Sequence, residues 1–176
     1  MRSGPWLPGP DPVSVDRPDL PGYGIEPADV GGLLPWDWAT ERLQASRNYW
    51  VATAAPDGVP HLAAVWAVWL GGAVYFSTGG RSVKARNLTA SARCVVTPEN
   101  ADRAVIVHGV AERVGDPAAI EFVRRAYVAK YGMGFPDPAA DPLFAVAPRV
   151  VLGLISAPAE FTTRATRWRF ASIDPL

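Results

Sequence analysis

The sequence predicts a mostly β protein, a small barrel of six or seven antiparallel strands with few, short helices. Runs rich in valine and aromatic residues recur along the chain, and this is the composition typical of strands. Turn sequences join the runs: Pro56-Asp57-Gly58 follows one of them, and Gly71-Gly72 separates two others as a two-residue hairpin turn does. Because helical segments are few, a barrel is favoured over a parallel sheet.

The predicted elements follow one another with short connections. The predicted strands occupy residues 48–54, 59–70, 73–77, 93–98, 104–114 and 149–155, with a last strand near the end of 161–170. The predicted helices occupy residues 36–43, 83–91 and 117–131, with a short helical turn at 143–146. Ser82 and Asp116 are good N-caps, and Pro117 suits a first helical position. A loop rich in glycine and proline is expected at 132–142.

The ends of the chain differ in composition, which predicts two parts. Residues 1–35 hold eight of the 18 prolines and six of the 16 glycines. Such a segment is disfavoured inside a sheet, so we expect an extended or disordered N-terminal arm. Residues 36–176 are predicted to form the barrel domain.

Bulk composition excludes several classes of function. A formal net charge of zero over 176 residues leaves no electrostatic footprint for nucleic acid or an anionic membrane. Cys94 is the single cysteine, so neither an intrachain disulfide nor a cysteine-based zinc site is expected, and no metal site is predicted. The sequence shows no secretion signal and no apolar run of ~20 residues, so we expect a cytoplasmic protein.

Positive charge gathers where the helix at 83–91 begins. Arg81, Lys84 and Arg86 stand there, although a helix N-terminus already carries a partial positive charge. An anion such as a phosphate would offset this charge, with hydroxyl groups available from Ser77, Thr78 and Ser82. The other interpretation, solvated surface cations on a short helix, stays open from charge placement alone.

Two motifs resemble those of a known family. Residues 82–88, Ser-Val-Lys-Ala-Arg-Asn-Leu, and residues 166–170, Thr-Arg-Trp-Arg-Phe, resemble segments of the pyridoxamine 5′-phosphate oxidase-like split β-barrel superfamily. Within it the chain looks like the actinobacterial branch that uses a deazaflavin coenzyme. The resemblance covers residues 36–170 and implies a homodimer with two cofactor sites at the subunit interface.

The resemblance also implies which residues bind the cofactor. Its phosphate is expected on Ser77, Thr78, Arg81, Ser82, Lys84, Arg86 and Asn87, with Lys84 the firmest of these. Its ring is expected along His61, Ala63, Ala64, Val65 and Trp66. The end of the partner chain is expected to close the pocket through Trp168, for which core packing is the alternative. Arg167 and Arg169 are expected to pair either with carboxylates at the subunit interface or with the acidic tail of the coenzyme.

The implied activity is that of a reductase. A deazaflavin (8-hydroxy-5-deazaflavin, coenzyme F-420) supports hydride transfer to a small organic acceptor, which demands little of the protein beyond placement and exclusion of water. His61 is the candidate proton donor, and a hydrogen bond to backbone or solvent is the other interpretation of that residue. Trp66 and Trp69 differ by three positions, so they are expected on opposite faces of the sheet, with Trp66 toward the pocket.

Two rival hypotheses remain open. One keeps the fold and exchanges the coenzyme for FMN, giving an FMN-dependent oxidase or reductase. Oxidation of a vitamin phosphate is disfavoured, because residues 60–69 contain no cation where true pyridoxamine phosphate oxidases carry an arginine and a lysine. The other rival is a protein that binds a flavin or deazaflavin without catalysis. Haem is disfavoured, because only His61 and His108 could ligate iron strongly.

Overall fold

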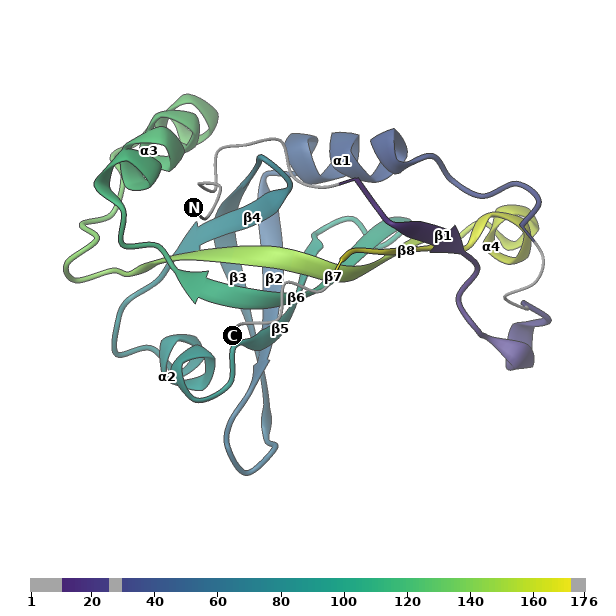
Figure 1. Ribbon diagram of the computed structural model, residues 1–176, viewed down its shortest axis with the longest axis horizontal. Helices are drawn as coiled ribbons and strands as arrows, with labels where there is room; N and C mark the ends of the chain where they lie inside the picture. The colour runs from purple at the N-terminus through teal and green to yellow at the C-terminus, as the bar shows by residue number, and fades with distance from the viewer. Residues whose placement is uncertain (1–10, 26–29, 172–176) are drawn as a thin grey trace.

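The computed structural model describes residues 11–25 and 30–171 (Figure 1). Its strands are β1 Ser14–Asp16, β2 Asn48–Ala54, β3 Pro60–Leu70, β4 Ala73–Ser77, β5 Arg93–Pro98, β6 Arg103–Arg113, β7 Leu143–Ile155 and β8 Thr166–Arg169. Its helices are α1 Trp36–Ala45, α2 Val83–Ala90, α3 Pro117–Tyr131 and α4 Pro158–Arg164, with a 3-10 turn, η1, at Pro21–Tyr23.

Six of the strands close into an antiparallel barrel, which confirms the predicted fold class. The strand order is β7-β4-β3-β2-β5-β6, and pairing of β6 with β7 closes the ring. The long strand β7 pairs with β6 along one edge and with two strands along the other. On that second edge, Leu143 to Val146 pair with β4, and Val150 to Gly153 pair with β8. Beyond the barrel, β8 and then β1 extend the sheet to the side, toward α4 (Figure 1).

The interior of the barrel follows from the alternation of side chains along its strands. On β2, Tyr49, Val51 and Thr53 are buried while their neighbours are more exposed, as the period of two requires. Buried residues from β2 to β8, with Leu43 of α1, form one core. A second apolar cluster lies where α3 packs on β3 and β4, through Tyr127 and others.

One local prediction near the C-terminus is wrong, and another is confirmed. The helical turn expected at 143–146 is the first part of β7, because pairing with β4 outweighs a local preference. The last strand expected near the end of 161–170 is present as Thr166–Arg169, and the helix α4 precedes it. Pro158 at the start of α4 fixes a helical backbone angle and favours this short helix.

The described part of the N-terminal arm packs on the barrel instead of extending into solvent. Strand β1 pairs with β8, and Ile25 and Leu34 are buried. Arg17 is almost completely buried and donates to the carbonyl oxygens of Thr162 (3.3 Å) and Thr163 (2.7 Å) at the end of α4. The described part of the arm, residues 11–25 and 30–35, is therefore fixed against the barrel, and the boundary at residue 35 stays a prediction. Within the described ranges, no helix has the length and apolarity needed to cross a membrane.

Candidate functional site

The turn between β4 and α2 presents backbone donors at the start of a helix. The Ser82 hydroxyl caps α2 by accepting from the Ala85 N–H group at 3.2 Å, and the Ser82 N–H group itself donates to the Gly79 carbonyl. Among residues 11–25 and 30–171, the N–H groups of Val83 and Lys84 have no acceptor. This helix start can therefore donate two hydrogen bonds to an added anion.

The three predicted cations lie around this helix start. Lys84 is half-buried, and no ion pair involves it in the part of the chain that the structure describes. Burial lowers the pKa of its ammonium group. Arg86 folds back and donates to the Arg81 carbonyl oxygen at 2.7 Å. Since the first turn of α2 contains no acidic residue, the charge here is not compensated locally.

Of the predicted hydroxyl groups, two point into this turn and one is used elsewhere. The Thr78 and Ser82 hydroxyls lie 3.2 Å apart beside the helix start. Ser77 instead donates to the Asp141 carbonyl oxygen at 2.7 Å, in the loop that precedes β7. The Gly80 N–H group likewise donates to Ala140 at 3.0 Å. Ser77 and Gly80 therefore join the two loops, and Ser77 is unavailable to a phosphate while that bond is made.

Asn87, which was predicted to bind the cofactor phosphate, also has a structural partner that the sequence did not predict. Its side-chain amide, which is buried, donates to the Thr53 hydroxyl at 3.1 Å and so fastens α2 to β2. Thr53 in turn pairs across the sheet with His61. The contact from Asn87 of α2 to the Thr53 hydroxyl, and the pairing of Thr53 with His61, therefore connect the cationic helix start with His61. The available signal was a threonine at an inward position in the otherwise apolar run of residues 51–54.

The predicted ring-binding residues on β3 do not share one surface. His61 lies on the face toward α2, and Ala63 and Val65 follow it at the period of two, with Val65 in the core. Ala64 and Trp66 project from the opposite, outer face. The side chains of only one of these two sets can contact a flat ring, whereas the backbone groups of the strand are shared by both, so the ring site along this strand stays a prediction.

Trp66 and Trp69 lie on opposite faces, as expected. Trp66 is 41% exposed and stacks on Tyr131 at a ring distance of 5.3 Å, whereas Trp69 is in the core. Beneath this stack, Lys130 of α3 donates to the Ala67 carbonyl oxygen at 2.9 Å. Burial lowers the pKa of Lys130 to about 8. No local pattern in the sequence predicts this cluster, since its members come from both β3 and α3.

Trp168 is not available to a cofactor, and its prediction as a ligand-binding residue is wrong. The side chain has 0% exposure, and its ring packs 5.4 Å from that of Trp36. A Cβ atom added at Gly153 would lie 2.6 Å from the Trp168 ring, so this glycine makes room for it. Trp168 therefore packs in the core, which was the alternative interpretation.

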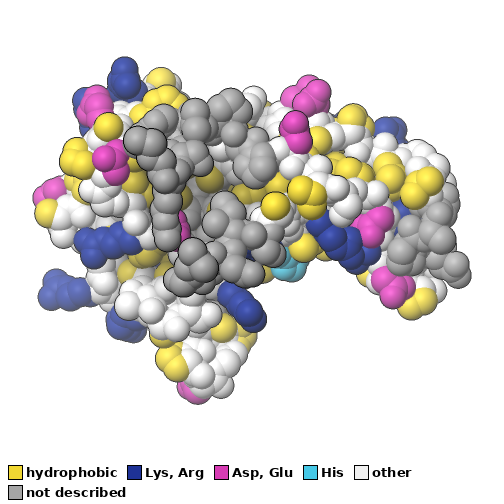
Figure 2. Space-filling view, in the orientation of Figure 1, with side chains coloured by type: hydrophobic (Ala, Val, Ile, Leu, Met, Phe, Trp, Pro, Cys, Tyr) yellow, Lys and Arg dark blue, Asp and Glu magenta, His cyan; other side chains and the backbone are white. Residues whose placement is uncertain are grey.

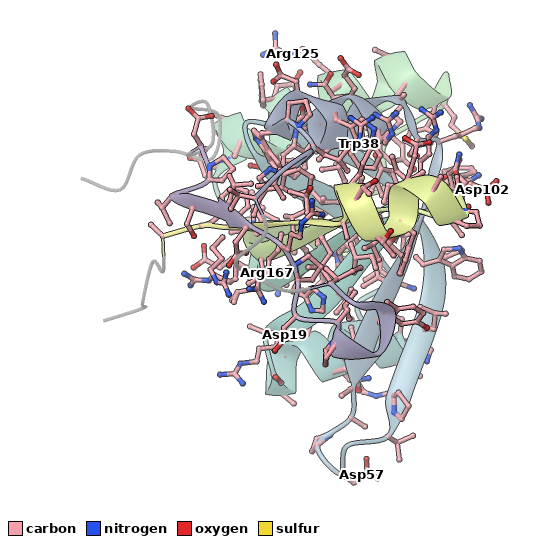
Figure 3. All side chains as sticks on the ribbon, turned by 90° about the vertical axis from the view of Figure 1, so that its right-hand side faces the viewer. Asp19, Trp38, Asp57, Asp102, Arg125 and Arg167 are labelled. Atoms are coloured by element: carbon pink, nitrogen blue, oxygen red, sulfur yellow. The ribbon has the colours of Figure 1, made fainter. Side chains whose placement is uncertain are left out.

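Arg167 and Arg169 flank Trp168 and pair with a carboxylate of the same chain. The Arg167 guanidinium donates to both oxygens of Asp16 at 2.8 Å, and Arg169 Nη1 donates to Asp16 Oδ2 at 2.8 Å. Figure 3 shows Arg167 where β1 crosses β8, far from the tip of the β2–β3 hairpin that Asp57 marks. The observed partner is a carboxylate, but it belongs to the same chain and not to a subunit interface, so it is neither of the two partners expected.

The barrel with its added edge strands and short helices is a split β-barrel. The chain belongs to the pyridoxamine 5′-phosphate oxidase family, because the family's sequence pattern matches residues 37–152. This confirms the predicted family resemblance. No curated protein sequence matches the chain significantly.

Solved structures show the same fold. A protein described as an F420 reductase is 25% identical, with a TM-score of 0.52 over 63% of this chain and 93% of the other. A conserved hypothetical protein from Mycobacterium tuberculosis is 22% identical, with a TM-score of 0.59 over 84% and 96% of the two chains. A heme binding protein from Mycobacterium smegmatis is 20% identical, with a TM-score of 0.58 over 69% of this chain and 55% of the other.

Proposed function

We propose that this protein is a deazaflavin-dependent reductase that binds coenzyme F-420 and transfers hydride to a small organic acceptor at a homodimer interface. Its family includes flavin-dependent oxidoreductases, and one solved structure of the same fold is described as an F420 reductase. The observation that carries the proposal is Lys84, half-buried and without an acidic partner in the described residues, at the start of a capped helix.

The helix start fits the phosphate of such a coenzyme. A phosphate there would receive the N–H groups of Val83 and Lys84, and the Thr78 hydroxyl lies beside them. It would also restore an ionic partner to the Lys84 ammonium group, whose charged form burial now disfavours. The roles of Arg81 and Arg86 are to add positive potential around this anion.

Two surfaces of β3 are available to the coenzyme ring, and the structure favours the outer one. There Ala64 is exposed, Trp50 of β2 stands directly opposite it, and Trp66 follows along the strand. A small residue between two large aromatic side chains provides a flat apolar surface. His61 faces α2 from the opposite side of β3, so it could donate a proton to the product only if the ring lay on that inner face.

The same outer face fits a second copy of the chain. Leu62 is 60% exposed, Trp50 42% and Trp66 41%, all on β2 and β3. A cluster of large exposed apolar side chains of this kind is typical of an interaction surface. Barrels of this family commonly dimerise, and a twofold mate over β2 and β3 would also exclude water from a ring lying there.

When bound, a deazaflavin supplies one hydride, which carries two electrons, to an activated double bond or imine. The contribution of the chain is to fix the phosphate at α2 and to present a flat apolar surface to the ring. The described residues around α2 and β3 contain no paired carboxylates, which is consistent with a reaction that needs only placement. An FMN enzyme or a coenzyme carrier would use the same phosphate site.

Binding titrations test the proposal directly. Lys84→Ala should weaken F-420 binding by about 1–3 kcal/mol, the range for losing a charged hydrogen bond. Arg125→Ala removes an exposed cation from α3 and serves as the matched control, with unchanged affinity expected. Calorimetry with F-420 and with FMN, on the wild type and both variants, ranks the two coenzymes. Equal affinity of Lys84→Ala and the wild type would reject the phosphate site.

Catalysis is separated from storage by turnover. The wild type loaded with reduced F-420 should oxidise it when an acceptor with an activated double bond is added, followed by the absorbance of the coenzyme. Reduced coenzyme that stays reduced with every acceptor in such a screen would favour the carrier.

The dimer is tested at the proposed interface. Leu62→Glu places a charge in the middle of the apolar face and should convert a dimer to a monomer in sedimentation velocity. Val128→Glu changes an exposed apolar residue of α3, 36% exposed, and should leave the dimer intact. A wild type that sediments as a monomer would contradict the interface.

A further inference from the structure

A cavity of about 420 Å³ lies in the outer wall of the barrel. It adjoins the face proposed for the dimer, since Ala52 of its lining lies opposite Leu62, but none of the proposed coenzyme contacts uses it. It is lined by residues 52–54 of β2, 93–95 of β5, 108–110 of β6 and Arg149 of β7. Its volume falls within the range of small-molecule sites, about 300–1,000 Å³. None of the predicted coenzyme-binding residues lines it.

The topology explains why a cavity forms here. Strand β2 pairs with β5 only as far as Ala52, opposite Val95, although β2 continues to Ala54 along β3. The two strands therefore separate beyond Ala52, which opens the wall. A register shift in the β6–β7 pairing, between His108 and Gly109, leaves Arg149 as an extra residue on β7. Bulges of this kind redirect a side chain, and this one directs Arg149 toward the opening.

The charge of the lining is one-sided. Arg93, His108 and Arg149 all line the cavity, and among residues 11–25 and 30–171 no aspartate or glutamate does. Arg93 and His108 are exposed and have no hydrogen-bond or ion-pair partner in the described part of the chain. Arg149 donates to the Ala171 carbonyl oxygen at 3.4 Å. Cys94 adds no negative charge, because burial raises the pKa of its thiol to about 12.

The remaining lining is small and apolar. Alanine side chains at 52 and 54 and the valines at 95 and 110 form the walls between the basic groups. A ligand that fits this surface combines a compact apolar body with a negatively charged end. Two guanidinium groups on separate strands suit a carboxylate or a phosphate, each of which accepts paired hydrogen bonds.

We propose that this cavity is a second ligand site, which binds a small organic anion. The carboxylate or phosphate of the ligand pairs with Arg93 and Arg149, beside His108, and its apolar body lies against residues 52–54 and 95. The site is separate from the start of α2, and the proposal does not depend on the coenzyme.

Calorimetry with three matched probes tests the site: 2-naphthoate, phenyl phosphate and the uncharged 2-naphthamide. We expect saturable binding of at least one anion, and binding of the amide at least tenfold weaker than that of naphthoate. The tighter of the two anions identifies the charged group. Absence of saturable anion binding, or equal binding of naphthoate and its amide, would overturn the proposal.

Variants locate the binding. Arg93→Gln should weaken the anion at least tenfold, the effect of losing a charged hydrogen bond, while the α3 control Arg125→Gln should not. His108→Asn provides a second substitution on another strand and should weaken it several-fold. Unchanged affinity in both Arg93→Gln and His108→Asn would show that the probe binds elsewhere and would reject the site.

The two sites are distinguished by measuring the affinity of each ligand for the variant of the other site. Arg93→Gln should leave F-420 affinity unchanged, and Lys84→Ala should leave naphthoate affinity unchanged. If Lys84→Ala weakens both ligands to the same extent, the anion binds at α2 and the second site is rejected. If naphthoate binds as expected and neither coenzyme binds, the cavity stands and the proposed function fails.

Discussion

Two basic regions of this molecule look alike in the sequence and differ in the structure. On β8, Arg167 and Arg169 share the carboxylate of Asp16, which lies opposite them on β1. At the start of α2, Lys84 has no carboxylate partner among the described residues, and burial lowers its pKa. Figure 2 shows the same contrast across the surface, with some basic groups beside acidic ones and others alone.

The contrast indicates what each region is for. A charge that the fold itself neutralises holds the fold together, and here it fixes the N-terminal strand to the barrel. A partly desolvated charge that the fold leaves uncompensated costs stability, which supports the ligand proposed at Lys84. The presence of a carboxylate partner, and not the residue type, distinguishes the structural cations of β8 from the proposed binding cation of α2.

The largest expected effect concerns Trp168, between the two arginines of β8. Trp168→Ala should destabilise the protein by about 3–5 kcal/mol, because it leaves a cavity in the core. Urea denaturation measures this loss. Affinity for F-420, measured under conditions where the variant is folded, should be unchanged. A variant that is as stable as the wild type but no longer binds the coenzyme would show that Trp168 is a binding residue and not a core residue.

A smaller effect is expected from the carboxylate of β1. Asp16→Asn should cost about 1–2 kcal/mol, since two guanidinium groups lose their charged acceptor. The hydrogen bond from Arg167 lowers the pKa of Asp16, so its stabilisation is present above the ordinary pKa and is lost as the pH falls through the folded-state pKa. Below about pH 4 the wild type should therefore approach the variant in urea midpoint. A constant difference down to pH 2 would contradict this assignment.

The smallest effect is expected at α2. Without ligand, Lys84→Ala should change the free energy of unfolding by no more than about 0.5 kcal/mol, since no partner is lost. With F-420 present, only the wild type should gain the full stabilisation expected from binding. A ligand-free cost as large as that of Asp16→Asn would remove the distinction between the two regions.

Much of the fold could be predicted, because local patterns specify it. The hairpin at Gly71-Gly72 needs a backbone conformation that few residues other than glycine adopt, and the cap at Ser82 needs a short side chain whose oxygen accepts from the start of the helix. Both glycines have positive φ, 53° and 80°, as a primed turn requires. The helix predicted from Asp116 to Tyr131 is present, and the Asp116 side chain caps it.

The site was predicted less completely, because its residues meet through contacts between distant segments. Ser77 was predicted to bind a phosphate, whereas in the structure its hydroxyl donates a hydrogen bond to the carbonyl oxygen of Asp141, more than 60 residues away. Asn87 was likewise assigned to the coenzyme, and its partner is Thr53. Neither pairing has a signature in the local sequence.

The amino-acid sequence by itself determined the antiparallel strands, the capped helix and the cluster of cations that begins it. These depend on neighbouring residues, so periodicity and turn chemistry suffice to specify them. Tertiary structure alone decided which cations are neutralised, that Trp168 is buried and that β2 and β5 separate to open a cavity. Each of these depends on which segments, distant in the chain, the closure of the barrel brings together.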